Sequence, residues 1–157
     1  MRALLMRKRA FTLIEILIVI GLLAGLSVSV LVGLRKYSET QALRTTTLTI
    51  ASLLGRAQAQ TFAREEGMQY GVYIGDTSAV LFSGTVYDSD AQSNTVRTFD
   101  SRVTALPMLA GGGDSVVFNL LEGDTDMYGT IVVYLVDDAT QAYTITIAPT
   151  GNVRIDN

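Results

Sequence analysis

Phe11-Thr12-Leu13-Ile14-Glu15 opens the most apolar stretch of the chain and follows a basic segment that ends Arg7-Lys8-Arg9-Ala10. Residues 16–34 contain neither a charged residue nor a proline. One helix of this kind is long enough to cross a bilayer, which needs about 20 apolar residues. Glu15 is a carboxylate just inside this run, where a charge costs about 2.5–3.5 kcal/mol at the middle of a membrane. We therefore expect Glu15 to have a partner.

These residues resemble the N-terminus of type IV pilins and type II secretion pseudopilins, where a basic leader precedes an FTLIE-type segment. The resemblance implies that prepilin peptidase removes residues 1–10 by cutting between Ala10 and Phe11. The family usually has Gly before the cut, so Ala10 departs from its pattern. The resemblance also implies that Phe11 becomes an N-methylated mature N-terminus, and that its ammonium pairs with Glu15 of a neighbouring subunit. An ammonium and a carboxylate buried together in hydrocarbon cost less than either buried alone.

An ordinary secretory signal peptide is the alternative for the same residues. It also begins with basic residues before an apolar core, and the small residues around Ser27 and Ser29 imitate a cleavage site. The apolar run is longer than a usual signal core of about 7–15 residues, however, and it continues without a break into a polar helix. These two features favour the pilin-like interpretation.

The composition excludes several classes of function. The chain has no cysteine and no histidine, so a disulfide framework, a thiolate metal site and histidine-based catalysis lack their residues. No nucleophile–base pair is visible, and Gly111-Gly112-Gly113 lacks the Lys-Ser/Thr of a phosphate-binding loop. We therefore expect the protein not to be an enzyme.

The charges are distributed unevenly along the chain. The first ten residues hold four of the twelve basic residues, which leaves eight basic against fifteen acidic residues in the remainder. Basic residues before an apolar span indicate a cytoplasmic start, with the following domain on the other side of the membrane.

Residues 35–66 continue the helix in amphipathic form. Leu43, Ile50, Leu54 and Ala57 recur at helical spacing with Leu53 beside them, which predicts one buried stripe. Arg44, Arg56, Gln58 and Arg64 fall on the other faces. Gly67 is the expected stop, so we expect one helix over about 11–66.

After Gly67 the pattern becomes that of β-strands. We expect strands at 70–74, 79–82, 85–87, 95–99, 115–121, 130–136, 142–148 and 153–155, with residues 106–114 as a connection. The predicted fold class is α+β: a long N-terminal helix, transmembrane in 11–34 and amphipathic in 35–66, packs on an antiparallel β-sheet domain over 67–157.

Part of the domain resembles the FimT/GspH-type minor pilins and pseudopilins. The similarity lies in the sequence at the end of the predicted helix, residues 53–67, in the strand Tyr70–Ile74 and in the late turn Pro149-Thr150-Gly151-Asn152. It implies a subunit of a bacterial type IV pilus or type II secretion system that assembles into a filament through its N-terminal helix. The implied partners are other pilin or pseudopilin subunits, prepilin peptidase, an inner-membrane assembly platform and the lipid bilayer. The implied location is the inner membrane, single-pass with a periplasmic or extracellular domain, and then the filament.

Glu122, Asp124 and Asp126 are weak candidates for a calcium site. They alternate along one predicted turn, and Ca²⁺ prefers about six to eight oxygen ligands. The segment is not an EF-hand, because Met127 stands where the invariant glycine would fall. A solvated acidic turn explains the three residues equally well, so no cofactor is expected.

Two other functions remain open. A DNA-uptake minor pilin needs basic residues for phosphate contacts, yet beyond residue 66 the chain has only Arg97, Arg102 and Arg154 and no lysine. An acidic domain repels nucleic acid. The second alternative is a membrane-anchored extracytoplasmic binding domain that never polymerises, for which neither cleavage before Phe11 nor Glu15 would matter.

Overall fold

The computed structural model describes residues 11–63, 65–120 and 122–156, apart from the side chains of 27–32 and 65. The predicted leader, including Ala10, lies outside the described residues. The chain divides into two compact units, with the boundary between Ser38 and Glu39.

Helix α1 (Leu13–Phe62) contributes residues to both units. The predicted stripe is confirmed: Leu43, Ile50, Leu53, Leu54 and Ala57 are all at most 5% exposed. These residues share one face of the helix, and that face packs into the core of the second unit.

Helix α1 ends at Phe62, earlier than the predicted end at residue 66. A short 3-10 turn, η1 (Glu65–Gly67), follows, and Glu66 and Gly67 have φ angles of 53° and 68°. These left-handed conformations stop an α-helix. The buried Thr61 side chain then holds the chain in place, because its hydroxyl accepts a 2.8 Å hydrogen bond from the Tyr70 amide.

Eight strands follow within the described residues. They are β1 (Tyr70–Ile74), β2 (Ser78–Ser83), β3 (Thr95–Thr98), β4 (Val103–Leu109), β5 (Ser115–Val117), β6 (Gly129–Leu135), β7 (Asp138–Ile147) and β8 (Val153–Asp156). They form two four-stranded sheets with the orders β3-β2-β1-β5 and β4-β6-β7-β8. All pairings are antiparallel. The predicted α+β class with an antiparallel β-domain is confirmed, and the division into two sheets is new information.

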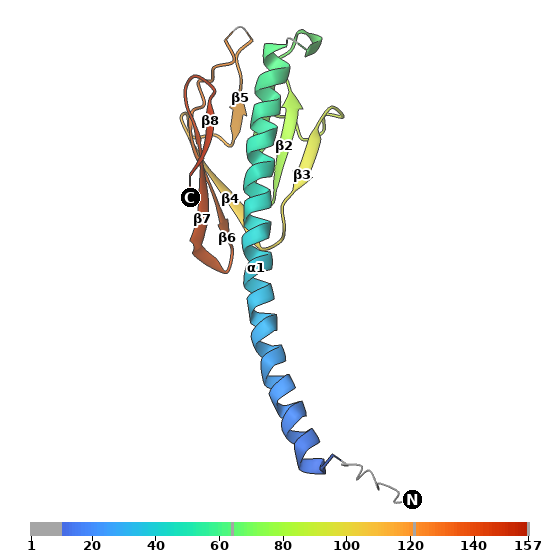
Figure 1. The fold of residues 1–157 in the computed structure, drawn as a ribbon. Coiled ribbons are helices and arrows are strands. Elements are labelled where there is room, and N and C mark those ends of the chain that lie inside the picture. The colour runs from blue at the N-terminus through green and yellow to red at the C-terminus, as the bar shows by residue number, and fades with distance from the viewer. Residues whose placement is uncertain (1–10, 64, 121, 157) are drawn as a thin grey trace, which may run out of the picture. The chain divides into compact units, whose positions relative to one another are not determined.

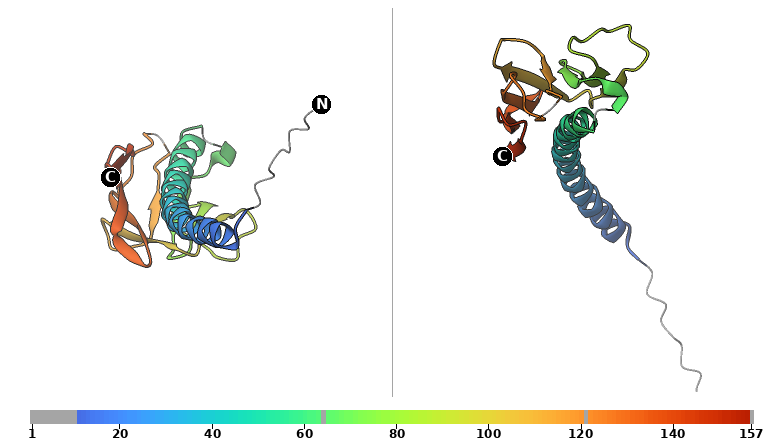
Figure 2. Two further views of the ribbon diagram at one scale, coloured as in Figure 1. Left: turned by 60° about the horizontal axis from the view of Figure 1, so that its bottom comes forward. Right: turned by 90° about the horizontal axis from the view of Figure 1, so that it is seen from above.

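The part of α1 in the second unit crosses in front of the strands in Figure 1, with β2 and β3 on one side of it and β5, β6, β7 and β8 on the other. Seen from above in the right panel of Figure 2, the green and the orange-to-red strands spread to opposite sides of the helix. The inner residues of both sheets meet the helix stripe in one core, which includes Val72, Leu81, Val133 and Ile145.

Other predictions of local structure are wrong as well. The strand predicted over 115–121 ends at Val117, and the strand predicted over 142–148 begins earlier, at Asp138. Residues 85–87 are not a strand, because the chain turns at Gly84, with φ of 111°, and Tyr87 stacks on Tyr73 at a ring-centroid distance of 4.3 Å. Strand β4 includes Pro107, which the sequence analysis placed in a connection. An edge strand tolerates proline where the N–H would point away from its neighbour.

The apolar run predicts a membrane span over 11–34. Within the residues that the structure describes, no helix has the length and apolarity that crossing a membrane requires.

Candidate functional site

Thr12 caps the start of α1. Its carbonyl oxygen accepts hydrogen bonds from the amides of Glu15 at 3.1 Å and Ile16 at 3.3 Å. Its hydroxyl accepts a second bond from the Glu15 amide at 3.3 Å. A threonine side chain that satisfies a free amide in this way is a favoured N-cap.

Glu15 therefore occupies the third position of the helix, three residues after its cap. Acidic side chains are favoured there, because the helix N-terminus carries partial positive charge. Sequence reasoning missed the role of Thr12, although the Thr-x-x-Glu spacing of a capping box was present to find it. The cap thus fixes the main-chain position of Glu15, and the side chain is exposed.

The side chains that follow are apolar and exposed on all faces of the helix. Phe11 is 75% exposed and Leu13 81% exposed, and every side chain from 11 to 26 falls in the exposed class. The large apolar members are Phe11, Leu13, Ile14, Ile16, Leu17, Ile18, Val19, Ile20, Leu22, Leu23 and Leu26. An uncovered apolar surface of this extent marks a site of contact with another protein or with lipid.

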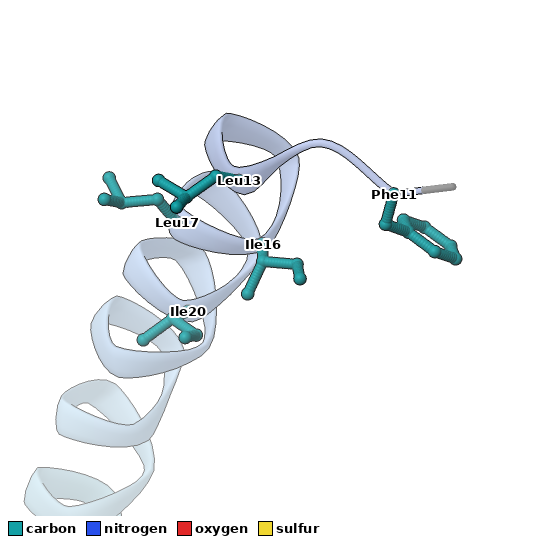
Figure 3. Close-up of a pocket in the computed structure, with 5 residues that line it drawn as sticks. All are labelled: Phe11, Leu13, Ile16, Leu17 and Ile20. Atoms are coloured by element: carbon teal, nitrogen blue, oxygen red, sulfur yellow. The ribbon is translucent and has the colours of Figure 1, made fainter. Parts of the chain in front are cut away.

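Two open hollows border this helix start. One, of about 640 Å³, is lined by Phe11, Leu13, Ile16, Leu17 and Ile20. Figure 3 shows Phe11 standing clear of the helix end, with Leu13 and Leu17 on one side and Ile16 and Ile20 on another. The other hollow, of about 270 Å³, is lined by Phe11, Glu15, Ile16, Val19 and Ile20. The structure thus brings Phe11 and Glu15 to the same hollow, with apolar side chains around them.

The calcium candidates lie in the loop between β5 and β6. Glu122 and Asp126 are exposed and Asp124 is half-buried. An open hollow beside this loop is lined by Asn119, Leu120, Glu122 and Asp124, and Asp126 does not reach it. The three predicted carboxylates therefore do not line one common hollow.

Two main-chain oxygens of this loop already accept hydrogen bonds within the protein. The Gly123 carbonyl accepts from Gln58 Nε2 at 2.8 Å, and the Asp124 carbonyl accepts from the Asn119 amide at 2.9 Å. No group of three or more acidic side chains among the described residues is arranged to hold a metal ion. The expectation that no cofactor binds stays a prediction.

Two of the three arginines after residue 66 form ion pairs. Arg102 donates to both carboxylate oxygens of Asp100 at 2.8 Å, and Arg154 lies 3.0 Å from Asp156. The side-chain and main-chain hydrogen bonds from Arg102 lower the pKa of Asp100 from 3.8 to about 2. Paired arginines attract phosphate less strongly, which weakens the case for DNA binding.

Comparison with solved structures places the fold among the minor pilins and pseudopilins. The chain resembles the minor pseudopilin EpsH of the Vibrio cholerae type II secretion system, with a TM-score of 0.54, 11% identity, and coverage of 74% of this chain and 94% of that one. It also resembles the type IV minor pilin FimU of Pseudomonas aeruginosa, with a TM-score of 0.52, 9% identity, and coverage of 76% and 91%. No protein-family model and no curated protein matches the sequence significantly. The pilin-like fold predicted from the sequence is confirmed.

Proposed function

We propose that this chain is a minor pilin or pseudopilin subunit of a type IV pilus or a type II secretion system. The observation that carries the proposal is the start of α1, where every described side chain from 11 to 26 is exposed and Glu15 is the only charged one. An exposed apolar surface of this kind is normally buried against protein or lipid. A carboxylate within it needs a positively charged partner. The pilin-like fold of the second unit supports the same role, which is structural and not catalytic.

Assembly follows from these two needs. After prepilin peptidase cuts between Ala10 and Phe11, the new Phe11 ammonium, N-methylated in this proposal, supplies the counter-charge. It meets Glu15 of a neighbouring subunit while the apolar helices pack together and remove their side chains from lipid or water. Burying the two charges together satisfies both, whereas either one alone would oppose assembly.

The subunit waits in the bacterial inner membrane as a single-pass protein with its domain outside the cytoplasm, and then enters the pilus or pseudopilus. The apolar and exposed side chains of the helix start support the membrane stage. The basic residues at 7–9 precede this helix, which supports a cytoplasmic start. In this account, other pilin-like subunits, the peptidase, an inner-membrane assembly platform and the lipid bilayer are the partners.

Glu15→Ala tests the proposal in cells that produce the matching filament. We expect the variant to reach the membrane in normal amounts and to be lost from the sheared filament fraction, because the Phe11 ammonium then has no partner. Immunoblots of membrane and filament fractions measure both quantities. Glu122→Ala, which removes an exposed carboxylate outside α1, is the matched control and should enter filaments normally. Normal incorporation of Glu15→Ala would contradict the pairing of Glu15 with the Phe11 ammonium. Absence of the native chain itself from filaments would favour the non-polymerising binding domain.

A further inference from the structure

The two sheets have four edge strands, and three of them offer a poor template for a further strand. On β5, the Val117 carbonyl accepts a 2.7 Å hydrogen bond from the Thr125 hydroxyl. On β3, the Val96 carbonyl accepts from the Arg97 guanidinium at 3.5 Å. Side-chain donors thus occupy part of both edges, which is one way in which proteins prevent unwanted strand pairing.

On β4, the hydrogen-bond register places a proline at the free edge. The Ala110 amide donates to the Tyr128 carbonyl, and the Val136 amide donates to the Arg102 carbonyl. Because antiparallel pairs alternate, the even-numbered residues of β4 bond to β6 and the odd-numbered ones point outward. Pro107 is one of the outward positions and has no N–H to offer, so the β4 edge is interrupted in its middle.

The β8 edge lacks such protection. The Ala148 amide donates to the Asn152 carbonyl at 2.9 Å, so 154 and 156 bond to β7 while Val153 and Ile155 point their main-chain groups outward. The structure gives these outward groups no hydrogen-bond partner among the described residues. Figure 1 shows β8 beside β7, next to the C-terminus of the chain.

The side chains of β8 are complementary to those of a second, antiparallel copy. Arg154 and Asp156 extend from the same face of the strand, and Ile155 lies between them and is 37% exposed. If Ile155 lies opposite Ile155 of the second copy, Arg154 lies opposite Asp156 on both sides of the axis. Opposite charges in directly facing positions stabilise a strand pair, and like charges destabilise it.

We propose that the β8 edge pairs with the β8 edge of a second copy of this chain in that register. The contact consists of two main-chain hydrogen bonds between the Ile155 residues and two reciprocal Arg154–Asp156 pairs. The β3 edge does not offer the same pairing of opposite charges, because Arg97 is its one charged residue. In any antiparallel pairing of two β3 strands, Arg97 would face another arginine or a neutral residue. The proposal concerns a surface of the second unit and does not depend on Glu15.

Cysteine cross-linking tests the register, because the chain has no native cysteine. Residues that exchange both hydrogen bonds have Cα atoms about 5.5 Å apart, within the disulfide window of about 4.4–6.8 Å. Full-length Ile155→Cys protein in detergent should therefore form disulfide dimers under mild oxidation. Val96→Cys, at an outward position of β3 that is 52% exposed, is the matched control and should dimerise about tenfold more slowly.

Charge reversal separates a contact between copies from the ion pair within one copy. Arg154→Asp and Asp156→Arg, each combined with Ile155→Cys, should each lower the dimer yield, because like charges then face one another. A mixture of the two variants should recover the yield as heterodimer, since an all-acidic edge then meets an all-basic edge. Mixing cannot restore an ion pair within one copy.

Recovery on mixing, together with faster cross-linking of Ile155→Cys than of Val96→Cys, supports the proposed pairing. Equal rates for the two cysteine variants, or no recovery on mixing, would overturn it. Either result leaves the Glu15→Ala filament experiment unaffected, so failure of this contact and failure of the proposed function can be told apart.

Discussion

Thr125 connects the two sheets at the scale of a single residue. Its side chain is 2% exposed. Its amide donates to the Pro149 carbonyl just before β8, and its hydroxyl donates to the Val117 carbonyl of β5. The same hydroxyl accepts from the Met127 amide at 3.1 Å. One buried residue, through its hydroxyl and its main-chain amide, thus links an edge of the first sheet to the last turn of the second.

Thr125→Val keeps the shape of the side chain and removes the hydroxyl. The Val117 carbonyl and the Met127 amide then lose their partner, and a buried polar group left without one costs about 1–3 kcal/mol. We expect the free energy of unfolding to fall by that amount in urea titrations. Thr98→Val, at an exposed position of β3, should change it by less than about 0.5 kcal/mol. Equal effects of the two substitutions would contradict the role given to Thr125.

Single residues were predicted unequally well from the sequence. The burial of Leu43, Ile50 and Leu54 was predictable because helical periodicity alone determines which face they share. The bridging role of Thr125 was not, because it depends on the fold that brings the turn at Pro149 next to the end of β5. The capping role of Thr12 is an intermediate case. Its spacing to Glu15 is that of a capping box, but the apolar residues around it dominate the sequence pattern.

At the scale of elements, the turn between β7 and β8 contacts the end of α1 at very short range. Gly151 has a φ of 77°, and an added Cβ would lie 2.1 Å from the Gly123 carbonyl oxygen and 2.5 Å from Gln58 Nε2. Gln58 Nε2 also donates to that same carbonyl. The helix, the β5–β6 loop and this turn therefore meet where only a glycine fits.

Gly151→Ala should accordingly destabilise the domain more than Gly67→Ala does. Gly67 has a similar φ of 68°, and nothing lies within 4 Å of its added Cβ. The Gly67 variant carries only the left-handed strain of a residue with a side chain, about 1–2 kcal/mol. The Gly151 variant adds a collision with main-chain atoms. Thermal unfolding of both proteins measures the difference, and indistinguishable melting temperatures would refute the close contact.

The turn between β3 and β4, which leads from the first sheet to the second, carries the Asp100–Arg102 pair. Arg102 lowers the pKa of Asp100 from 3.8 to about 2. A lowered pKa in the folded state stabilises the fold above pH 3.8, and this contribution is lost as the pH falls toward 2. Both side chains are about a third exposed, so solvent screens the pair and the effect is small.

The expected result is a steeper loss of stability for the native chain than for Asp100→Asn between about pH 4 and pH 2. Urea midpoints at several pH values in this interval measure it. Parallel curves for the two proteins would show that the ion pair contributes nothing to stability.

Elements with strong local patterns were predictable, and their pairing was not. Strand β1 begins and ends where the alternation of Tyr70, Val72 and Ile74 predicts. Strand β4 was missed because Pro107 and the glycines after it resemble a connection, and only the register to β6 shows why proline is tolerated there. The neighbour relation of β1 and β5 depends on contacts across more than 40 residues, which periodicity does not encode.

At the scale of the whole molecule, the chain consists of two units with different surfaces. The first exposes apolar side chains around the start of α1, and the second buries its apolar residues in one core between α1 and two sheets. A surface that apolar is stable only with a partner. In the proposed filament, the partners are the helices of other subunits, joined by the Phe11 ammonium and the Glu15 carboxylate.

The ammonium exists only if residues 1–10 are removed, so the intact mass of the protein tests the account most directly. The chain should be extracted from membranes of cells whose prepilin peptidase demonstrably processes another pilin. We predict a mass that corresponds to a chain beginning at Phe11, with the addition of one methyl group. A mass that still includes residues 1–10 would contradict the account, because Glu15 would then have no amine to meet.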